Sequence, residues 1–176
     1  AAVAVVRRVA LGVAAGHARG VVHRDLKPGN VLWDEDNNDV FVTDFGLARV
    51  PGTNTLNPNN QAMGTPGYMA PEQARGEHVG PPADVFALGV ILFELLTGVR
   101  PFPAGWPAYL YQVTQENAKP PSSSRPGLDP RLDALCLKAL AKDPAARFPT
   151  ARELAAALTD FLRSTGGIDD AINSRP

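Results

Sequence analysis

The sequence has one cysteine and no excess of charge of either sign. Cys136 has no partner for an internal disulfide, which fits a reducing compartment, and no second cysteine or nearby histidine suggests a zinc site. Lysine and arginine total 17 against 18 acidic residues, so the net charge is -1. Phosphate contacts supply most of the affinity of nucleic-acid-binding proteins. The composition therefore disfavours both a nucleic-acid partner and an anionic membrane surface.

Long hydrophobic runs are also missing. The longest one, Val85–Phe93, continues past Glu94 but falls short of the roughly 20 apolar residues that cross a bilayer. It predicts a buried helix, and no membrane segment is expected in this chain. The first residues include neither an initiator Met nor a secretory signal, since Arg7 and Arg8 interrupt the apolar stretch. We expect a cytoplasmic chain that starts within a domain, with any membrane anchor of the parent protein outside it.

The patterning predicts one mainly α-helical domain with a small β-hairpin. Apolar residues at helical spacing predict a helix over 3–19 that Gly20 ends, and Cys136 falls on an apolar helical face as a buried hydrophobe. Two short β-branched and aromatic runs, 31–33 and 40–42, flank an Asp/Asn-rich turn. Further helices are predicted over 85–96 with Asp84 as the N-cap and Gly98 as the stop, over 108–116, from 130 to about 142, and from 150 to about 163. Residues 51–64 are predicted to form a long loop that is functional or mobile, and 166–176 a flexible tail.

Three chemically distinct side chains lie within six residues, in His23-Arg-Asp-Leu-Lys-Pro-Gly-Asn30. Phosphoryl transfer requires an oriented hydroxyl and neutralised charge more than covalent chemistry. Asp25 could accept the hydroxyl proton, Lys27 could face a phosphate, and Asn30 could offer a metal its amide oxygen. Asp44-Phe-Gly46 adds a further carboxylate after the second strand. Alone, Asp44 could be a turn residue and Lys27 a solvated lysine; their spacing favours the catalytic interpretation.

These two motifs resemble the catalytic loop and the metal-binding tripeptide of protein kinases, and Ala70-Pro-Glu72 matches the third motif of that family in order. The resemblance covers residues 3–163. It implies the protein-kinase-like fold, with Asp25 as catalytic base, Lys27 as the γ-phosphate cation, and Asn30 and Asp44 as Mg²⁺ ligands. ATP and Mg²⁺ are the implied cofactors, and Ser/Thr residues of proteins the implied substrates. Lys27 in Asp-Leu-Lys-Pro resembles the serine/threonine branch, and residues 69–73 and 140–148 resemble the bacterial, eukaryotic-like kinases.

The same resemblance implies supporting roles. Thr65 would bond Asp25 and Lys27 beneath the substrate, Asp84 would hold the catalytic-loop backbone, and Glu72 would form a buried ion pair with Arg147. His23 is interpreted as a packed scaffold histidine, and no role is assigned to His17. Thr53 and Thr55 are predicted phosphorylation sites whose phosphate Arg24 receives, with Arg49 as a second cation. The alternative is that these threonines are merely solvated loop residues.

The sequence also departs from the family. It contains no Gly-x-Gly-x-x-Gly stretch, and none of its four lysines lies in the strand context of the family's nucleotide-binding lysine. We therefore expect the C-terminal, large lobe only (residues 1–165), with the small lobe missing and the isolated chain inactive. Two alternatives stay open: a non-catalytic lobe that docks protein partners, and an incomplete product that folds poorly.

Overall fold

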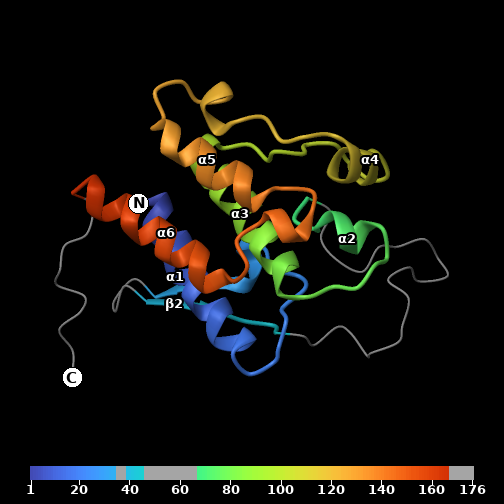
Figure 1. The fold of residues 1–176 in the computed structure, drawn as a ribbon, viewed down its shortest axis with the longest axis horizontal. Coiled ribbons are helices and arrows are strands. Elements are labelled where there is room, and N and C mark those ends of the chain that lie inside the picture. Colours follow the sequence, from blue (N-terminus) through green and yellow to red (C-terminus); the bar gives the residue numbers. More distant parts are fainter. Residues whose placement is uncertain (35–38, 46–66, 167–176) are drawn as a thin grey trace.

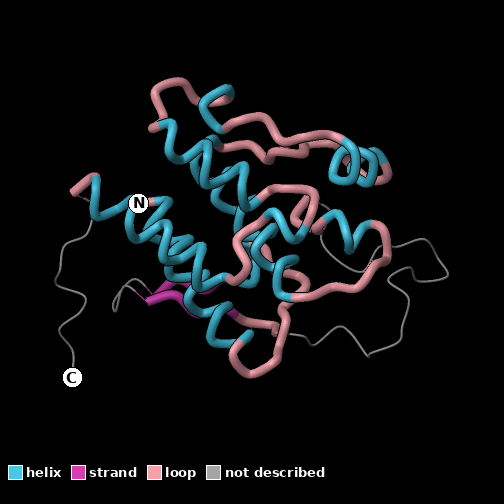
Figure 2. Tube along the Cα trace, viewed as in Figure 1, coloured by secondary structure: helices cyan, strands magenta, loops and turns pink. Residues whose placement is uncertain are grey.

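The computed structural model describes residues 1–34, 39–45 and 67–166, and its described part is mainly helical with one small sheet (Figures 1 and 2). This agrees with the predicted mainly α class. The α-helices are α1 (Ala2–His17), α2 (Pro71–Ala74), α3 (Pro81–Thr97), α4 (Ala108–Gln115), α5 (Pro130–Ala139) and α6 (Ala151–Ser164). Short 3-10 turns cover Pro28–Asn30, Pro121–Ser123 and Pro144–Ala146, and the strands are β1 (Val31–Asp34) and β2 (Asp39–Val42).

Helix α3 forms the centre of the core. Residues 83–93 are all buried, as expected for an apolar run that lacks a polar face. Helices α1, α5 and α6 pack against it, and α1 and α6 lie side by side along much of their lengths (Figure 1). Cys136 on α5 is fully buried, as predicted. No helix in the described residues is long and apolar enough to span a membrane.

Three predicted helix boundaries are wrong. Helix α1 ends at His17 instead of 19, and residues 18–20 form a turn. Helix α3 begins at Pro81 with Gly80 as its N-cap, so Asp84 lies in the first turn and its carboxylate is free for other contacts. Helix α5 ends at Ala139 instead of about 142. The carbonyls of Ala141 and Lys142 turn away from the helix to accept hydrogen bonds from the Arg147 guanidinium. The predicted caps Asp129 and Thr150 do accept backbone hydrogen bonds, and Gly98 ends α3 at a φ of 78°.

The β-hairpin covers one side of α1. Its antiparallel register places Leu32 opposite Phe41 and Trp33 opposite Val40. Val40 and Val42 pack against the core, whereas Leu32 and Phe41 are 54% and 55% exposed. Directly opposite residues share a face of the sheet. The hairpin therefore presents an apolar face to solvent beside the loops that carry Asn30 and Asp44.

Candidate active site

The loop between α1 and β1 brings Asp25, Lys27 and Asn30 together. Lys27 Nζ lies 2.9 Å from Asp25 Oδ2, and both side chains stay partly exposed. Asn30 is buried, and its Nδ2 donates a hydrogen bond of 2.9 Å to the Asp25 carbonyl oxygen. The 3-10 turn Pro28–Asn30 sets this spacing, with the Asn30 amide nitrogen donating to the Lys27 carbonyl. The Asp25 carboxylate is therefore accessible and lies beside the Lys27 cation, while the Asn30 side-chain amide holds the Asp25 backbone.

Asp84 fixes the loop from inside the core. Its carboxylate accepts hydrogen bonds of 2.8 Å from the backbone nitrogens of both His23 and Arg24. The Nε2 atom of His17 lies 2.7 Å from Asp84 Oδ2. A carboxylate that is only 1% exposed needs such donors, since an unpaired buried charge is strongly unfavourable. His17 carries no signal in the sequence, since no local pattern there points to this long-range contact.

Gln73 on α2 holds the same loop from a second side. Its Nε2 donates to the Arg24 carbonyl at 2.8 Å, and its Oε1 accepts from the Ala70 amide at 3.0 Å. Arg24 itself has a φ of 67°, a left-handed conformation that costs a residue with a Cβ about 1–2 kcal/mol. Hydrogen bonds at both its amide and its carbonyl thus keep Arg24 in this conformation. Sequence reasoning missed Gln73, which shows no signal beyond its place after the Ala-Pro-Glu motif.

A second segment, residues 43–45, is tied to the loop through backbone contacts. The Thr43 amide donates to the Asn30 carbonyl at 2.9 Å, and the Thr43 carbonyl lies 2.8 Å from His23 Nε2. Asp44 has a φ of 60° and an exposed side chain. The Phe45 ring lies 4.9 Å from the His23 ring, between centroids, and packs on Gly16 of α1. His23 is accordingly a buried scaffold residue, and its contacts bring Asp44 to the Asn30 side of the loop.

Asn30 and Asp44 offer the oxygen ligands that Mg²⁺ prefers. Because Asn30 Nδ2 is held by the Asp25 carbonyl, the Oδ1 atom of the same amide points to the other side. No group of three or more His, Cys, Asp or Glu side chains suited to a metal occurs in the described residues. Mg²⁺ is commonly held by one or two carboxylates together with substrate phosphates and water. The residues present fit a metal that arrives with a nucleotide.

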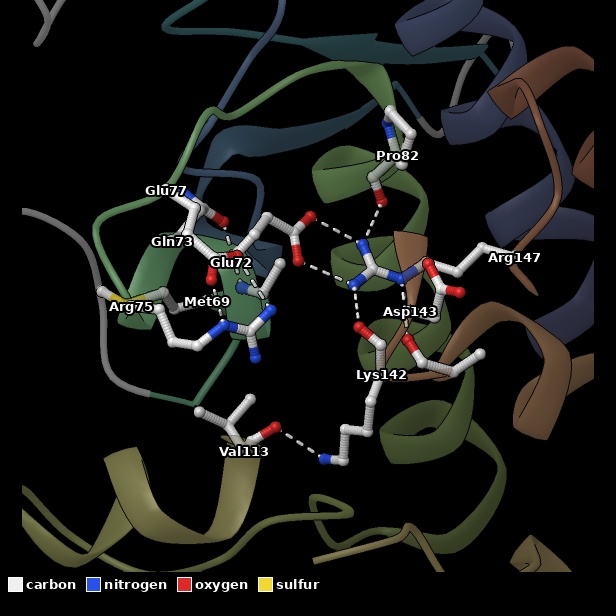
Figure 3. Close-up of polar contacts among 12 residues, drawn as sticks. Met69, Glu72, Gln73, Arg75, Glu77, Pro82, Val113, Lys142, Asp143 and Arg147 are labelled. Carbon is white, nitrogen blue, oxygen red and sulfur yellow. Dashed lines mark hydrogen bonds and ion pairs between the residues drawn. The ribbon is translucent and has the colours of Figure 1, made fainter. Parts of the chain in front are cut away.

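A buried ion pair joins α2 to the segment after α5 (Figure 3). Arg147 donates to both carboxylate oxygens of Glu72 at 2.7 Å, and both side chains are almost fully buried. The remaining Arg147 donors reach three backbone carbonyls, those of Pro82, Ala141 and Lys142. All five N–H groups of this guanidinium therefore have acceptors, which is the condition for a buried ion pair to be tolerated.

Lys142 ties α4 to this cluster (Figure 3). Its Nζ donates to the Val113 carbonyl at 2.6 Å and lies 4.0 Å from the centroid of the Phe102 ring. Burial, and secondarily the Arg147 charge, lower the pKa of Lys142 to about 8. Sequence reasoning gave Lys142 no role.

The predicted activation-segment residues Thr53, Thr55 and Thr65 lie outside the described residues, as do Gly46 and Arg49. Their expected contacts with Asp25, Lys27 and Arg24 therefore stay predictions.

Comparison with known proteins matches the family model "Protein kinase domain" to residues 1–158. The chain is 45% identical over 145 residues to serine/threonine-protein kinase PknB of Mycolicibacterium smegmatis, a match covering 81% of this chain and 23% of that protein. It is 42% identical over 154 residues to PknB of Mycobacterium tuberculosis (86% and 24%), and 41% identical over 166 residues to PknD of that species (93% and 25%). The chain thus spans about a quarter of the length of these curated relatives, and it belongs to the protein kinase domain family.

Proposed function

We propose that this chain is the C-terminal lobe of a kinase domain, and that its parent protein transfers the γ-phosphoryl group of ATP to Ser or Thr residues of proteins. The observation that carries the proposal is the Asp25–Lys27 pair at 2.9 Å, anchored through the bond from Asn30 to the Asp25 carbonyl. It supplies a proton acceptor and a cation on one short loop. The relatives' printed names give the substrate class, protein serine and threonine residues.

In this proposal Asp25 orients the substrate hydroxyl and accepts its proton. As that proton passes to the carboxylate, the hydroxyl oxygen bonds to the γ-phosphorus and the bond from phosphorus to the bridging oxygen breaks, releasing ADP. Lys27, next to the carboxylate, would neutralise negative charge on the transferring group. When bound, Mg²⁺ supplies further charge neutralisation at the phosphates, and Asn30 and Asp44 would hold it.

The exposed apolar hairpin face supports the assignment to one lobe. Leu32 and Phe41 lie side by side, more than half exposed, next in the chain to the proposed metal ligands. Such a surface is suited to being covered by a second lobe together with the flat base of a nucleotide. It would equally suit a protein partner, so the non-catalytic docking lobe stays the second candidate. An ATP titration of the full-length protein with Mg²⁺ separates the two, because only an enzyme should bind and turn over the nucleotide.

We extend the proposal to regulation of the parent by phosphorylation at Thr53 or Thr55. Arg24 Nε is shielded from solvent and makes no hydrogen bond to the described residues, so this side chain retains a donor for an incoming phosphate. A phosphate adds about -1.5 to -2 charges at neutral pH, and Arg is its usual partner. Thr65 is assigned to the substrate side instead, where its hydroxyl would bond Asp25 and Lys27.

Asp25→Asn in the full-length protein tests the catalytic assignment. The change keeps side-chain size but removes the proton acceptor, so kcat should fall by at least about 100-fold, the usual contribution of a general base. Asp39→Asn, at an exposed position of β2, is the matched control and should leave both kcat and the melting temperature unchanged. Turnover near that of the unmodified protein in Asp25→Asn would exclude Asp25 as the base. In the same assay, full activity of a Thr53→Ala/Thr55→Ala variant would exclude the regulatory proposal alone.

A further inference from the structure

A basic groove lies between α1 and α6, away from the catalytic loop. Its volume is about 290 Å³, and Arg7 and Leu11 of α1 form one wall. The α6 wall consists of residues at helical spacing that share one face, among them Arg152, Thr159 and Arg163. Helices α1 and α6 contact each other closely along this line, so the backbones that present the arginines are fixed by the core (Figure 1).

The charge in this α1–α6 groove is unbalanced. Three arginines line it against a single acidic residue, Asp160, which leaves a net charge of +2. Within the described residues none of the three guanidiniums forms a hydrogen bond or an ion pair. Elsewhere the chain does provide acidic partners: Arg131 binds Asp129, and Arg147 binds Glu72.

Arg7 is the least exposed of the three arginines that line the groove. Its Nε is shielded from solvent and makes no hydrogen bond to any described residue. Burial, and secondarily the neighbouring Arg8 charge, lower the pKa of Arg7, which means that its surroundings disfavour the positive charge. A shielded N–H donor without an acceptor is destabilising. An anion in the groove would remove this cost.

We propose that the α1–α6 groove is a binding site for a phosphate dianion, either a free phosphate or the phosphate of a phosphorylated side chain. A guanidinium presents paired N–H groups that match two oxygens of a phosphate, and three guanidiniums can share its tetrahedral oxygens. The volume suits a group of this size with its first neighbours but not a folded segment. The site is independent of the phosphoryl-transfer proposal, since none of its residues belongs to the catalytic loop.

Calorimetric titration of the 176-residue chain with inorganic phosphate at constant ionic strength tests the site, with chloride as the reference anion. We expect saturable phosphate binding that is weakened about tenfold in Arg163→Gln, since a hydrogen bond to a charged group contributes about 1.5 kcal/mol. Arg152→Gln/Arg163→Gln should show no measurable binding. Both arginines are exposed, so these variants should keep the melting temperature of the unmodified chain. Arg19→Gln, an exposed arginine near the C-terminal end of α1, is the matched control and should bind normally.

A second arm identifies the source of the phosphate. A short phosphoserine peptide and its unphosphorylated twin are titrated in the same way. Tighter binding of the phosphoserine peptide than of inorganic phosphate would assign the groove to phosphorylated proteins, and equal or weaker binding would assign it to free phosphate. Absence of saturable binding by both phosphate forms, or equal weakening in Arg163→Gln and Arg19→Gln, would overturn the proposal.

Discussion

Removing the Glu72 carboxylate should destabilise the fold severely. In Glu72→Ala the Arg147 guanidinium stays buried with its charge uncompensated, and two of its five N–H donors lose their acceptors. Loss of one partner from a buried ion pair costs about 3–5 kcal/mol. Total stabilities of domains are about 5–15 kcal/mol, so the variant should lose a large part of its free energy of unfolding.

Urea unfolding followed by circular dichroism measures this loss. With a typical denaturant slope of about 2 kcal/mol per molar, the unfolding midpoint of Glu72→Ala should fall by about 2 M. Glu77→Ala is a close control. Glu77 lies five residues after Glu72 and also accepts two hydrogen bonds from an arginine, Arg75, but this pair is exposed to solvent. Exposed ion pairs contribute little to stability, so the Glu77→Ala midpoint should hardly move.

The comparison between the two variants can refute the reasoning. If Glu72→Ala and Glu77→Ala shift the midpoint equally little, burial does not set the importance of the Glu72–Arg147 pair. A double-mutant cycle with Arg147→Ala then locates the error, since strongly coupled partners give a double-variant loss well below the sum of the single losses.

Two further predictions concern α1 and the end of α4. Gly16→Ala in the full-length protein should lower kcat, because a Cβ there would collide with the Phe45 ring and displace Asp44. Stability should fall little, since alanine favours the helix. An unchanged kcat would show that the Phe45 ring can pack elsewhere without moving Asp44. The free energy of unfolding of the chain should rise between pH 8 and 9, because the lowered pKa of Lys142 lets the folded state release its proton before the unfolded state does, and Lys142→Met should remove this rise. Urea midpoints measured across this pH interval test the effect. The interval ends at the ordinary pKa of cysteine, above which Cys136 would also titrate in the unfolded chain. A rise that persists in Lys142→Met would assign it to another group.

Periodicity in the sequence was enough to predict the long helices and the hairpin. The apolar run through α3 and the amphipathic stretches of α1, α5 and α6 are each longer than two turns, so their patterns are distinct. Helix α2, with four residues, is too short to show a period, and it was missed. The end of α5 was placed too late: the backbone leaves helical geometry at Leu140, and the carbonyls that follow, those of Ala141 and Lys142, accept from Arg147. Boundaries of this kind depend on tertiary contacts that local patterns do not contain.

In the candidate site, too, the local arrangement could be predicted from the sequence and the long-range contacts could not. Asp25, Lys27 and Asn30 lie within six residues, so the sequence alone suggested their chemistry, and local turns bring them together. The contact of Asp84 with the loop spans about 60 residues and was anticipated only through the family resemblance. His17 offered no signal, because only its contact with Asp84, 67 residues away, distinguishes it from a surface histidine on a helix.

These long-range contacts explain how a short loop can hold a strained geometry. Arg24, directly before Asp25, is left-handed at a cost comparable with one good hydrogen bond, and it would relax if its neighbours allowed. Its amide is held by Asp84 of α3 and its carbonyl by Gln73 of α2, while His17 of α1 braces the Asp84 carboxylate. Three helices thus fix the backbone of one residue on both sides, and that residue sets the direction of the Asp25 side chain that follows it. The position of the proposed base Asp25 therefore depends on the packing of the buried helix α3, which carries Asp84.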